Sequence, residues 1–251
     1  MKVGIFGFGR AGRSVAAVFL QSPDVELEWV IRRSSKLEFR SVPEFLGIPS
    51  NDRDPGLVYS RDEFTPAELF DKHPVDVVVD FSAEEGLDYY GEEAARRDIT
   101  IVTAVSHYPR NRVVLLRKLA RRTAVLWSPN ITIGINFLIL ASKVLQKIAP
   151  YTDIEVVEEH FKAKAGLSGT ALRIAEALGL SPGRIKKIRA GGIIGTHEVI
   201  FGFPYQTVRL KHESISREAF GDGALFAALH LHGRKAGLYT MEDLLLPFFT
   251  V

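Results

Sequence analysis

Three glycines near the start of the chain have the spacing of a dinucleotide-binding loop. The apolar segment Lys2–Phe6 runs into Gly7, Gly9 and Gly12, and a helical pattern begins at Gly12. In such a loop the first glycine permits a tight turn, the second lets the backbone approach a pyrophosphate, and the third lets the helix pack closely on the strand. Unpaired N–H groups at the helix N-terminus favour phosphate. This context predicts nucleotide binding rather than a merely structural turn.

The end of the second predicted strand indicates which dinucleotide binds. An NAD-preferring site places Asp or Glu there for the ribose 2′-hydroxyl, whereas Leu27–Ile31 is followed by Arg32, Arg33, Ser34 and Ser35. Arginine pairs with phosphate through a bidentate fork and stacks on adenine. A solvated basic turn is the alternative interpretation. The position of the pair favours NADPH over NADH, and use of both nucleotides stays open.

A second group of chemically active residues lies past the middle of the chain. His160 ends an alternating segment, Lys164 follows it, and the run Ser168–Thr170 opens a helical pattern. Histidine gives or takes a proton near neutrality, lysine can anchor or protonate an anion, and a helix start can hold a carboxylate. The cluster suits a small dianionic substrate that accepts a hydride. A packed histidine, an ordinary helix cap and a solvated lysine face remain open on spacing alone.

Composition excludes several classes of function. The 251 residues are 46% hydrophobic and 25% charged with a net charge of +2, which is ordinary for a globular protein and favours neither nucleic acid nor an anionic membrane as partner. Without cysteine there are no disulfides, thiol nucleophiles or thiolate metal sites. His230 and His232 lack nearby carboxylates, so we predict no metal. With no signal peptide and no membrane-spanning apolar run in the sequence, we expect a cytoplasmic protein.

Strands and helices alternate in the first half, which predicts an α/β fold with a Rossmann-type parallel sheet. The strands are expected at Lys2–Phe6, Leu27–Ile31, Val75–Asp80, Ile99–Thr103 and Ala124–Trp127, and the helices at Gly12–Leu20, Glu84–Arg97 and Asn111–Arg122. The Pro-, Asp- and Arg-rich segment Glu38–Thr65 is expected to be irregular.

The second half predicts a mixed α+β domain that holds the substrate. Its expected elements are helices at Ile133–Ile148, from Ser168 to about Leu178, at Gly223–Leu231 and at Met241–Leu246, and strands at Asp153–His160, Glu198–Phe203 and Thr207–Ser214, the last two antiparallel. We therefore expect a dinucleotide-binding domain over residues 1–128 and a substrate domain over residues 129–221.

Together these residues resemble the 4-hydroxy-tetrahydrodipicolinate reductase (dihydrodipicolinate reductase) family of the diaminopimelate route to lysine. The similarity covers nearly the whole chain, and its most specific runs are Glu158-x-His160-x-x-x-Lys164, Ser168–Ala171, Arg189–Gly191, Ile194–His197 and His212-x-x-x-Ser216-Arg217. Further matches are Gly7–Arg13, Val79–Ser82, Ser128–Asn130 and Gly237–Met241.

The resemblance implies roles for particular residues. His160 is the expected proton donor and acceptor, Lys164 the second proton donor, and Ser168, Gly169 and Thr170 the binders of a substrate carboxylate. Residues expected to line the cofactor are Gly7, Phe8, Gly9, Arg10, Ala11, Gly12, Arg32, Arg33, Phe81, Thr103, Ser128, Pro129, Asn130 and Ile131. The resemblance also implies reduction of a dianionic cyclic imine by NADPH. It further implies a mixed sheet in the second domain, through which a homotetramer forms, and a C-terminal segment, residues 222–251, that packs back on the first domain.

The chain departs from the family pattern at four places: three lie in or beside the expected substrate pocket, and the last is expected to affect its lid or the subunit contacts. Phe161 replaces a second histidine that contacts substrate, and the Lys164–Ser168 segment lacks an acidic residue, a proline and one residue of length. Val102–Val105 replaces a Gly-Thr-Thr-Gly run, and the connection Gly179–Ile188 is short. Two alternatives therefore stay open: a related reductase acting on another carboxylated cyclic imine or enoyl acid, and a catalytically silent NADP-binding protein.

Overall fold

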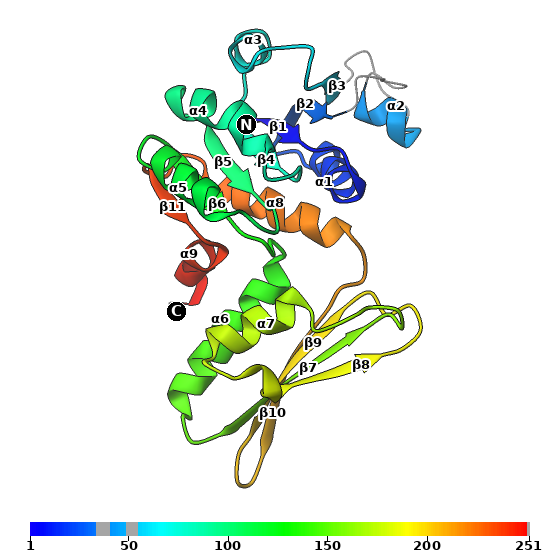
Figure 1. The fold of residues 1–251 in the computed structure, drawn as a ribbon, viewed down its shortest axis with the longest axis vertical. Coiled ribbons are helices and arrows are strands. Elements are labelled where there is room, and N and C mark those ends of the chain that lie inside the picture. The colour runs from blue at the N-terminus through cyan, green and yellow to red at the C-terminus, as the bar shows by residue number, and fades with distance from the viewer. Residues whose placement is uncertain (34–40, 49–54, 250–251) are drawn as a thin grey trace.

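The computed structural model describes residues 1–33, 41–48 and 55–249, which build two sheets arranged one above the other (Figure 1). The upper sheet has seven strands in the order β11-β6-β5-β4-β1-β2-β3, all parallel. The strands are β1 (Lys2–Phe6), β2 (Glu26–Arg32), β3 (Leu57–Ser60), β4 (Val77–Asp80), β5 (Thr100–Thr103), β6 (Ala124–Trp127) and β11 (Gly237–Tyr239). The predicted α/β fold with a Rossmann-type sheet is confirmed.

Helices cover both faces of this sheet, because its central strands are apolar on both sides. One face packs against α1 (Arg10–Gln21) and α8 (Glu218–Leu231), with Val3, Ile5 and Phe19 in its core. The other face packs against three helices, α3 (Pro66–Lys72), α4 (Gly86–Arg96) and α5 (Arg110–Leu119). The strand order reverses between β1 and β4, so ligands are expected beyond the carboxyl ends of these two strands.

The lower sheet has the order β10-β9-β7-β8. Its strands are β7 (Asp153–His160), β8 (Ile185–Arg189), β9 (Thr196–Gly202) and β10 (Thr207–Glu213). β8 is parallel to β7 and the other pairs are antiparallel, so the implied mixed sheet is present. Two helices, α6 (Ile133–Ile148) and α7 (Gly169–Ala177), pack on one face over a core that includes Ile139, Val156, Ile174 and Phe201.

Several elements differ from the sequence-based prediction. The segment expected to be irregular contains α2 (Val42–Leu46) and β3, and Ser34 and Ser35 lie outside the described residues. The short connection Gly179–Ile188 contains the 3₁₀ turn η1 (Pro182–Arg184) and most of β8. β3, β11 and α3 were also missed. These elements are short, and β8 exposes its central lysines, so none has a long periodic pattern.

The C-terminal segment returns to the upper sheet. β11 extends the sheet beside β6, and α9 (Met241–Leu245) is followed by the 3₁₀ turn η2 (Leu246–Phe249). α8 begins at Glu218, earlier than predicted, and a Cβ at its Gly221 would lie 2.6 Å from Val18 of α1. Close packing of these two helices therefore outweighs the low helix propensity of the glycines. None of the described helices is long and apolar enough to cross a membrane.

A buried carboxylate, Asp80, lies at the end of β4 where the strand order reverses. It has no exposed surface and accepts hydrogen bonds from the Ser82 N–H at 2.8 Å, the Ser82 hydroxyl at 2.6 Å and the Tyr90 hydroxyl at 2.8 Å. Burial raises the pKa of Asp80 from 3.8 to about 6, although these hydrogen bonds oppose the rise. Asp80 thereby fixes the turn at Ser82 beside the glycine loop, but its charge costs stability at neutral pH.

The stability cost of Asp80 predicts a pH-dependent effect of Asp80→Asn. Because the pKa of Asp80 is higher in the folded than in the unfolded protein, this carboxyl stabilises the fold fully only below pH 3.8. That stabilisation is lost as the pH rises through about 6. The free energy of unfolding of the variant relative to wild type should therefore increase from acidic to neutral pH, by on the order of 3 kcal/mol at most. Chemical denaturation across this pH range measures it, with Asp88→Asn as an exposed control. A constant difference would show that burial does not perturb Asp80.

Candidate active site

The glycine loop after β1 has the geometry that a nucleotide phosphate needs. Gly7 has a φ of +100°, and a Cβ there would lie 2.6 Å from the backbone of Phe81. A Cβ at Gly12 would lie 2.0 Å from the carbonyl oxygen of Gly7, so helix and strand meet there. At Gly9 nothing lies within 4 Å of the added atom, and this residue caps the N-terminus of α1. The open space at Gly9 therefore fits a pyrophosphate beside free N–H groups.

A cleft of about 490 Å³ extends from this loop along the ends of β1, β2 and β4. It is lined by Phe6, Gly7, Phe8, Gly9, Ile31, Arg32, Arg33, Arg61, Phe81, Ser82, Ala83, Glu85 and Gly86. Arg32 and Arg33 are thus brought together with the glycine loop. Arg61 is a third guanidinium that the sequence did not reveal, because it follows the unpredicted strand β3. Its N–H donates to the carbonyl of Arg32 at 2.9 Å, and its guanidinium lies 5.6 Å from the ring centroid of Tyr89.

A second cleft of about 350 Å³ lies between the two sheets, and Phe81 lines both clefts. The second cleft is lined by Ala11, Phe81, Ala104, Ser106, Pro129, Asn130, Ile131, Thr132, Ile135, His160, Thr170, Ile194, Gly195, His197, Ser214, Ser216, Arg217 and Phe220. It brings His160 and Thr170 together with Phe81, which also lines the first cleft. His197, Arg217 and Phe220 are lining residues that sequence reasoning did not assign to the site, although His197 and Arg217 lie in runs that resemble the family.

Four of the expected cofactor residues lie outside these lining sets: Gly12, where helix and strand meet, and Thr103, Ser128 and Arg10. The Thr103 hydroxyl is buried and lies 2.8 Å from the Tyr108 hydroxyl, so its partner is a protein group. Ser128 is also buried and donates to the Asn130 carbonyl at 2.7 Å, which shapes the start of the chain segment lining the second cleft. Arg10 is exposed at the first turn of α1.

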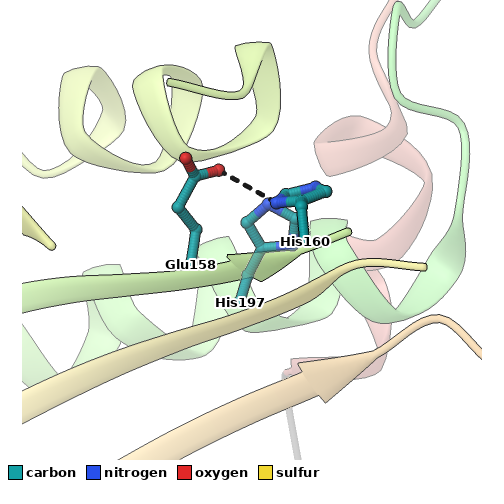
Figure 2. A group of neighbouring side chains, drawn as sticks. All are labelled: Glu158, His160 and His197. Carbon is teal, nitrogen blue, oxygen red and sulfur yellow. Dashed lines mark ion pairs between the residues drawn. The ribbon is translucent and has the colours of Figure 1, made fainter. Parts of the chain in front are cut away.

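The alternation of β7 places Ile154, Val156, Glu158 and His160 on the buried face of the lower sheet. Figure 2 shows the Glu158 carboxylate directed at the His160 ring, where Oε2 lies 3.3 Å from Nδ1. Burial lowers the pKa of His160, and the charges of Lys164 and Arg189 lower it further, whereas Glu158 raises it. The imidazole therefore lies between charges of opposite sign, and a further anion bound beside it would raise its pKa.

Glu158 is fully buried but has strong partners. Its Oε1 accepts from Arg189 Nη2 at 2.6 Å, and its carboxylate accepts from the Ser168 N–H at 3.1 and 3.2 Å. Burial opposes ionisation, but these hydrogen bonds outweigh it and lower the pKa of the carboxyl. Glu158 is therefore a buried anion beside His160, and it also holds the residue at which α7 begins.

The run Ser168–Thr170, which we call the carboxylate cradle, forms the N-terminus of α7. The Ser168 hydroxyl accepts a hydrogen bond from the Ala171 N–H at 3.0 Å. It also lies 3.1 Å from Nε2 of His197, a residue of β9. Burial, followed by the neighbouring His160, lowers the pKa of His197 to about 4, so His197 is neutral at physiological pH. Asn130 Nδ2 donates to the Thr170 hydroxyl at 3.0 Å, which joins the cradle to the segment after β6.

The remaining expected substrate residues are placed less directly. Lys164 is half-buried in the loop between β7 and α7, and its charge acts on both His160 and His197. Gly169 is exposed and a Cβ there would meet nothing within 4 Å, which leaves the helix end open to a ligand. Phe161 is 44% exposed and is not among the described residues that line the second cleft.

Glu158, His160 and His197 could be considered as a metal site, because their ligand atoms lie within 4.8 Å of one another. The surroundings disfavour a cation. Both oxygens of Glu158 already accept hydrogen bonds, and the positive charges of Arg189 and Lys164 lie nearby. These charges suit a bound anion and a mobile proton better than a divalent ion. The absence of a metal remains a prediction.

Comparison with known proteins agrees with this geometry. A family model described as dihydrodipicolinate reductase, N-terminus, matches residues 1–131, and one described as dihydrodipicolinate reductase, C-terminus, matches residues 131–245. A 4-hydroxy-tetrahydrodipicolinate reductase of Caldanaerobacter subterraneus is 38% identical over 195 residues, covering 69% of this chain and 78% of that protein. One from Burkholderia thailandensis is 29% identical over 273 aligned positions, covering 98% of each chain.

Solved structures share the fold. A dipicolinate-bound dihydrodipicolinate reductase from Paenisporosarcina superposes with a TM-score of 0.78 at 19% identity, covering 97% of this chain and 98% of that one. A diaminopimelate dehydrogenase of C. glutamicum has a TM-score of 0.58 at 12% identity, covering 97% and 93%. From the two family models and the sequence relatives, the chain belongs to the dihydrodipicolinate reductase family of NAD(P)H-dependent oxidoreductases.

Proposed function

We propose that this protein reduces 4-hydroxy-tetrahydrodipicolinate to tetrahydrodipicolinate, with NADPH as the preferred reductant. The observation that carries the proposal is the single cleft that unites His160 and Thr170 with Phe81 of the nucleotide cleft, in a chain of this family. The net reaction adds a hydride and a proton to the substrate and releases water.

The preference for NADPH rests on the charges along the nucleotide cleft. Among the described residues that line it there are three arginines, Arg32, Arg33 and Arg61, and one carboxylate, Glu85. Glu85 is the N-cap residue of α4, which follows β4, whereas an NAD-type acidic residue would follow β2. The arginines suit a 2′-phosphate through bidentate hydrogen bonds. When bound, the nicotinamide would supply the hydride, and Phe81, which lines both clefts, would help to hold it.

We assign substrate binding and proton movement to His160 and Thr170, which line the second cleft, and to Lys164, Ser168 and Gly169, which lie outside its lining residues. The N–H groups of Gly169 and Thr170 and the Thr170 hydroxyl donate hydrogen bonds to one substrate carboxylate, helped by the partial positive charge of the α7 N-terminus. The pKa of His160 is lowered in the free protein. A dianion bound beside it raises that pKa again, so substrate binding loads His160 with the proton it must donate. Lys164 is the second proton donor and balances the remaining negative charge.

The domain division and assembly follow the same proposal. We place the dinucleotide-binding domain at residues 1–128 together with 222–251, and the substrate domain at 129–221. Helices α6 and α7 occupy one face of the lower sheet (Figure 1). We propose that a homotetramer forms through the opposite face of the lower sheet. We also propose that the protein acts in the cytoplasm.

The activity is tested by following oxidation of NADPH while the unstable substrate is generated in place from pyruvate and aspartate semialdehyde by its synthase. Rapid turnover supports the proposal. Tight NADPH binding without turnover would contradict it and would indicate a different carboxylated imine or enoyl acid as substrate.

His160→Ala and Lys164→Ala should each lower kcat by about 100-fold or more, because each removes a group that moves a proton. The dissociation constant for NADPH should stay unchanged, since neither side chain lines the nucleotide cleft. Steady-state kinetics and nucleotide fluorescence measure the two effects. His107→Ala and Lys162→Ala, which remove an exposed histidine and an exposed lysine, are the controls. Unchanged turnover in either active-site variant would reject the proton-transfer role of the residue replaced.

The combined change Arg32→Ala and Arg33→Ala should weaken NADPH by about 10- to 100-fold, because charge-assisted hydrogen bonds to the 2′-phosphate are lost. Affinity for NADH should change little. Arg61→Ala, measured separately by calorimetry, should show the same selectivity with a smaller loss, and Arg121→Ala serves as an exposed control. An equal loss for both nucleotides would rule out recognition of the 2′-phosphate.

A further inference from the structure

Arg189, the last residue of β8, makes an unusual number of hydrogen bonds for one side chain. Its Nη2 donates to Glu158 Oε1 and to the Gly166 carbonyl, both at 2.6 Å, and its Nε donates to the Lys164 carbonyl at 3.0 Å. Its Nη1 donates to the Ile188 carbonyl at 2.8 Å. The side chain is 15% exposed. Four of the five N–H groups of a guanidinium are therefore engaged.

Two of these acceptors belong to the loop 161–167, which joins β7 to α7. Gly166 has a φ of +62°, so the chain reverses there just before Ser168. The loop contains no proline that would stiffen it. Among the described residues, the backbone hydrogen bonds of this loop, such as that from the Lys162 N–H to the Gly191 carbonyl, lie in its first half. Its second half therefore depends on a side chain to satisfy its carbonyls.

This loop carries Lys164, one of the two proposed proton donors. Arg189 holds the Lys164 backbone through the carbonyl, and it holds Glu158, the carboxylate that faces His160. Glu158 in turn accepts from the N–H of Ser168, where the carboxylate cradle begins. One guanidinium thus connects both proton donors and the cradle.

We propose that Arg189 is a positioning residue for the reaction: it fixes the loop that carries Lys164 and holds the Glu158 carboxylate beside His160. Arg189 is not among the described residues that line either cleft, so it acts through these groups rather than on the substrate. This inference rests on the proposed function, because the roles of His160 and Lys164 belong to it.

Arg189→Lys separates the charge of Arg189 from its hydrogen-bond geometry. An ammonium keeps the positive charge near Glu158, but a single nitrogen cannot reach acceptors spread around a planar fork. The variant should therefore fold with the ion pair retained while the bonds to Lys164 and Gly166 are lost. Arg184→Lys is the matched control: Arg184 Nη1 pairs at 2.7 Å with Glu155, another β7 carboxylate, and is 49% exposed.

In the kinetic experiment, Arg189→Lys should lower kcat by about 10- to 100-fold, since small misplacement of a catalytic group has effects of this size. The dissociation constant for NADPH should stay at its wild-type value, and Arg184→Lys should behave as wild type. A kcat of Arg189→Lys equal to that of the control would overturn the proposal.

A titration of His160 by NMR gives a readout that a merely structural role would not move. The charged or titratable groups acting on His160 are Glu158 from β7, Arg189 from β8, His197 from β9 and Lys164 from the loop. Glu158→Gln should lower the pKa of His160, and Arg189→Met should raise it, because the charges have opposite signs. Arg189→Lys should leave it near wild type. Shifts in the same direction for the first two variants would contradict the arrangement.

Hydrogen exchange tests the loop without any activity. The amides of residues 161–170 should exchange faster in Arg189→Lys than in Arg184→Lys, because the anchored carbonyls are released. Equal exchange would overturn the proposal even if kcat fell.

If the wild-type protein does not reduce the substrate, the proposed function fails, whereas exchange and the His160 titration still decide the role of Arg189. If Arg189→Met does not fold, the lysine variant decides alone.

Discussion

The buried carboxylate of Glu158 is the constraint on which the substrate half of the molecule depends. A fully buried anion is strongly destabilising unless charged and polar donors surround it, and here the donors come from two different elements. Arg189 ends β8 and Ser168 begins α7, while His160 ends the same strand as Glu158, with its Nδ1 3.3 Å from the carboxylate. The partners that this one side chain requires therefore bring together, at the end of β7, the residues to which we assign proton transfer and carboxylate binding.

The nucleotide half depends on a comparable close approach between backbones. Gly7 passes so near to Phe81 that a side chain at the glycine would collide with it, and Asp80 fixes the turn that follows. This contact joins the ends of β1 and β4 where the strand order reverses. Because Phe81 lines both clefts, the same contact sets the two clefts side by side.

Local placement of charge, rather than total charge, gives the protein its preference for anions. The net charge is only +2. Three arginines nevertheless border the nucleotide cleft, Lys164 acts on both buried histidines, and the N-terminus of α7 begins at Ser168. The pKa of both histidines is lowered, and in the proposed reaction a bound anion would raise it again. The Glu158, His160 and His197 cluster is therefore better suited to proton transfer than to metal binding.

The sequence by itself determined the Rossmann-type sheet and most of the helices and strands, because periodicity is a local property. It also proposed His160, Lys164 and Ser168–Thr170 as site residues, from motif spacing and the family resemblance. Only the tertiary structure showed where Arg61 and His197 lie and what Glu158 and Arg189 contact. Arg61 and Arg189 follow or end short strands without a strong pattern, and His197 lies opposite Glu158 on a neighbouring strand. Strand register, which pairs Glu158 with His197 and His160 with Arg189, is set by contacts between distant segments and leaves no local trace in the chain.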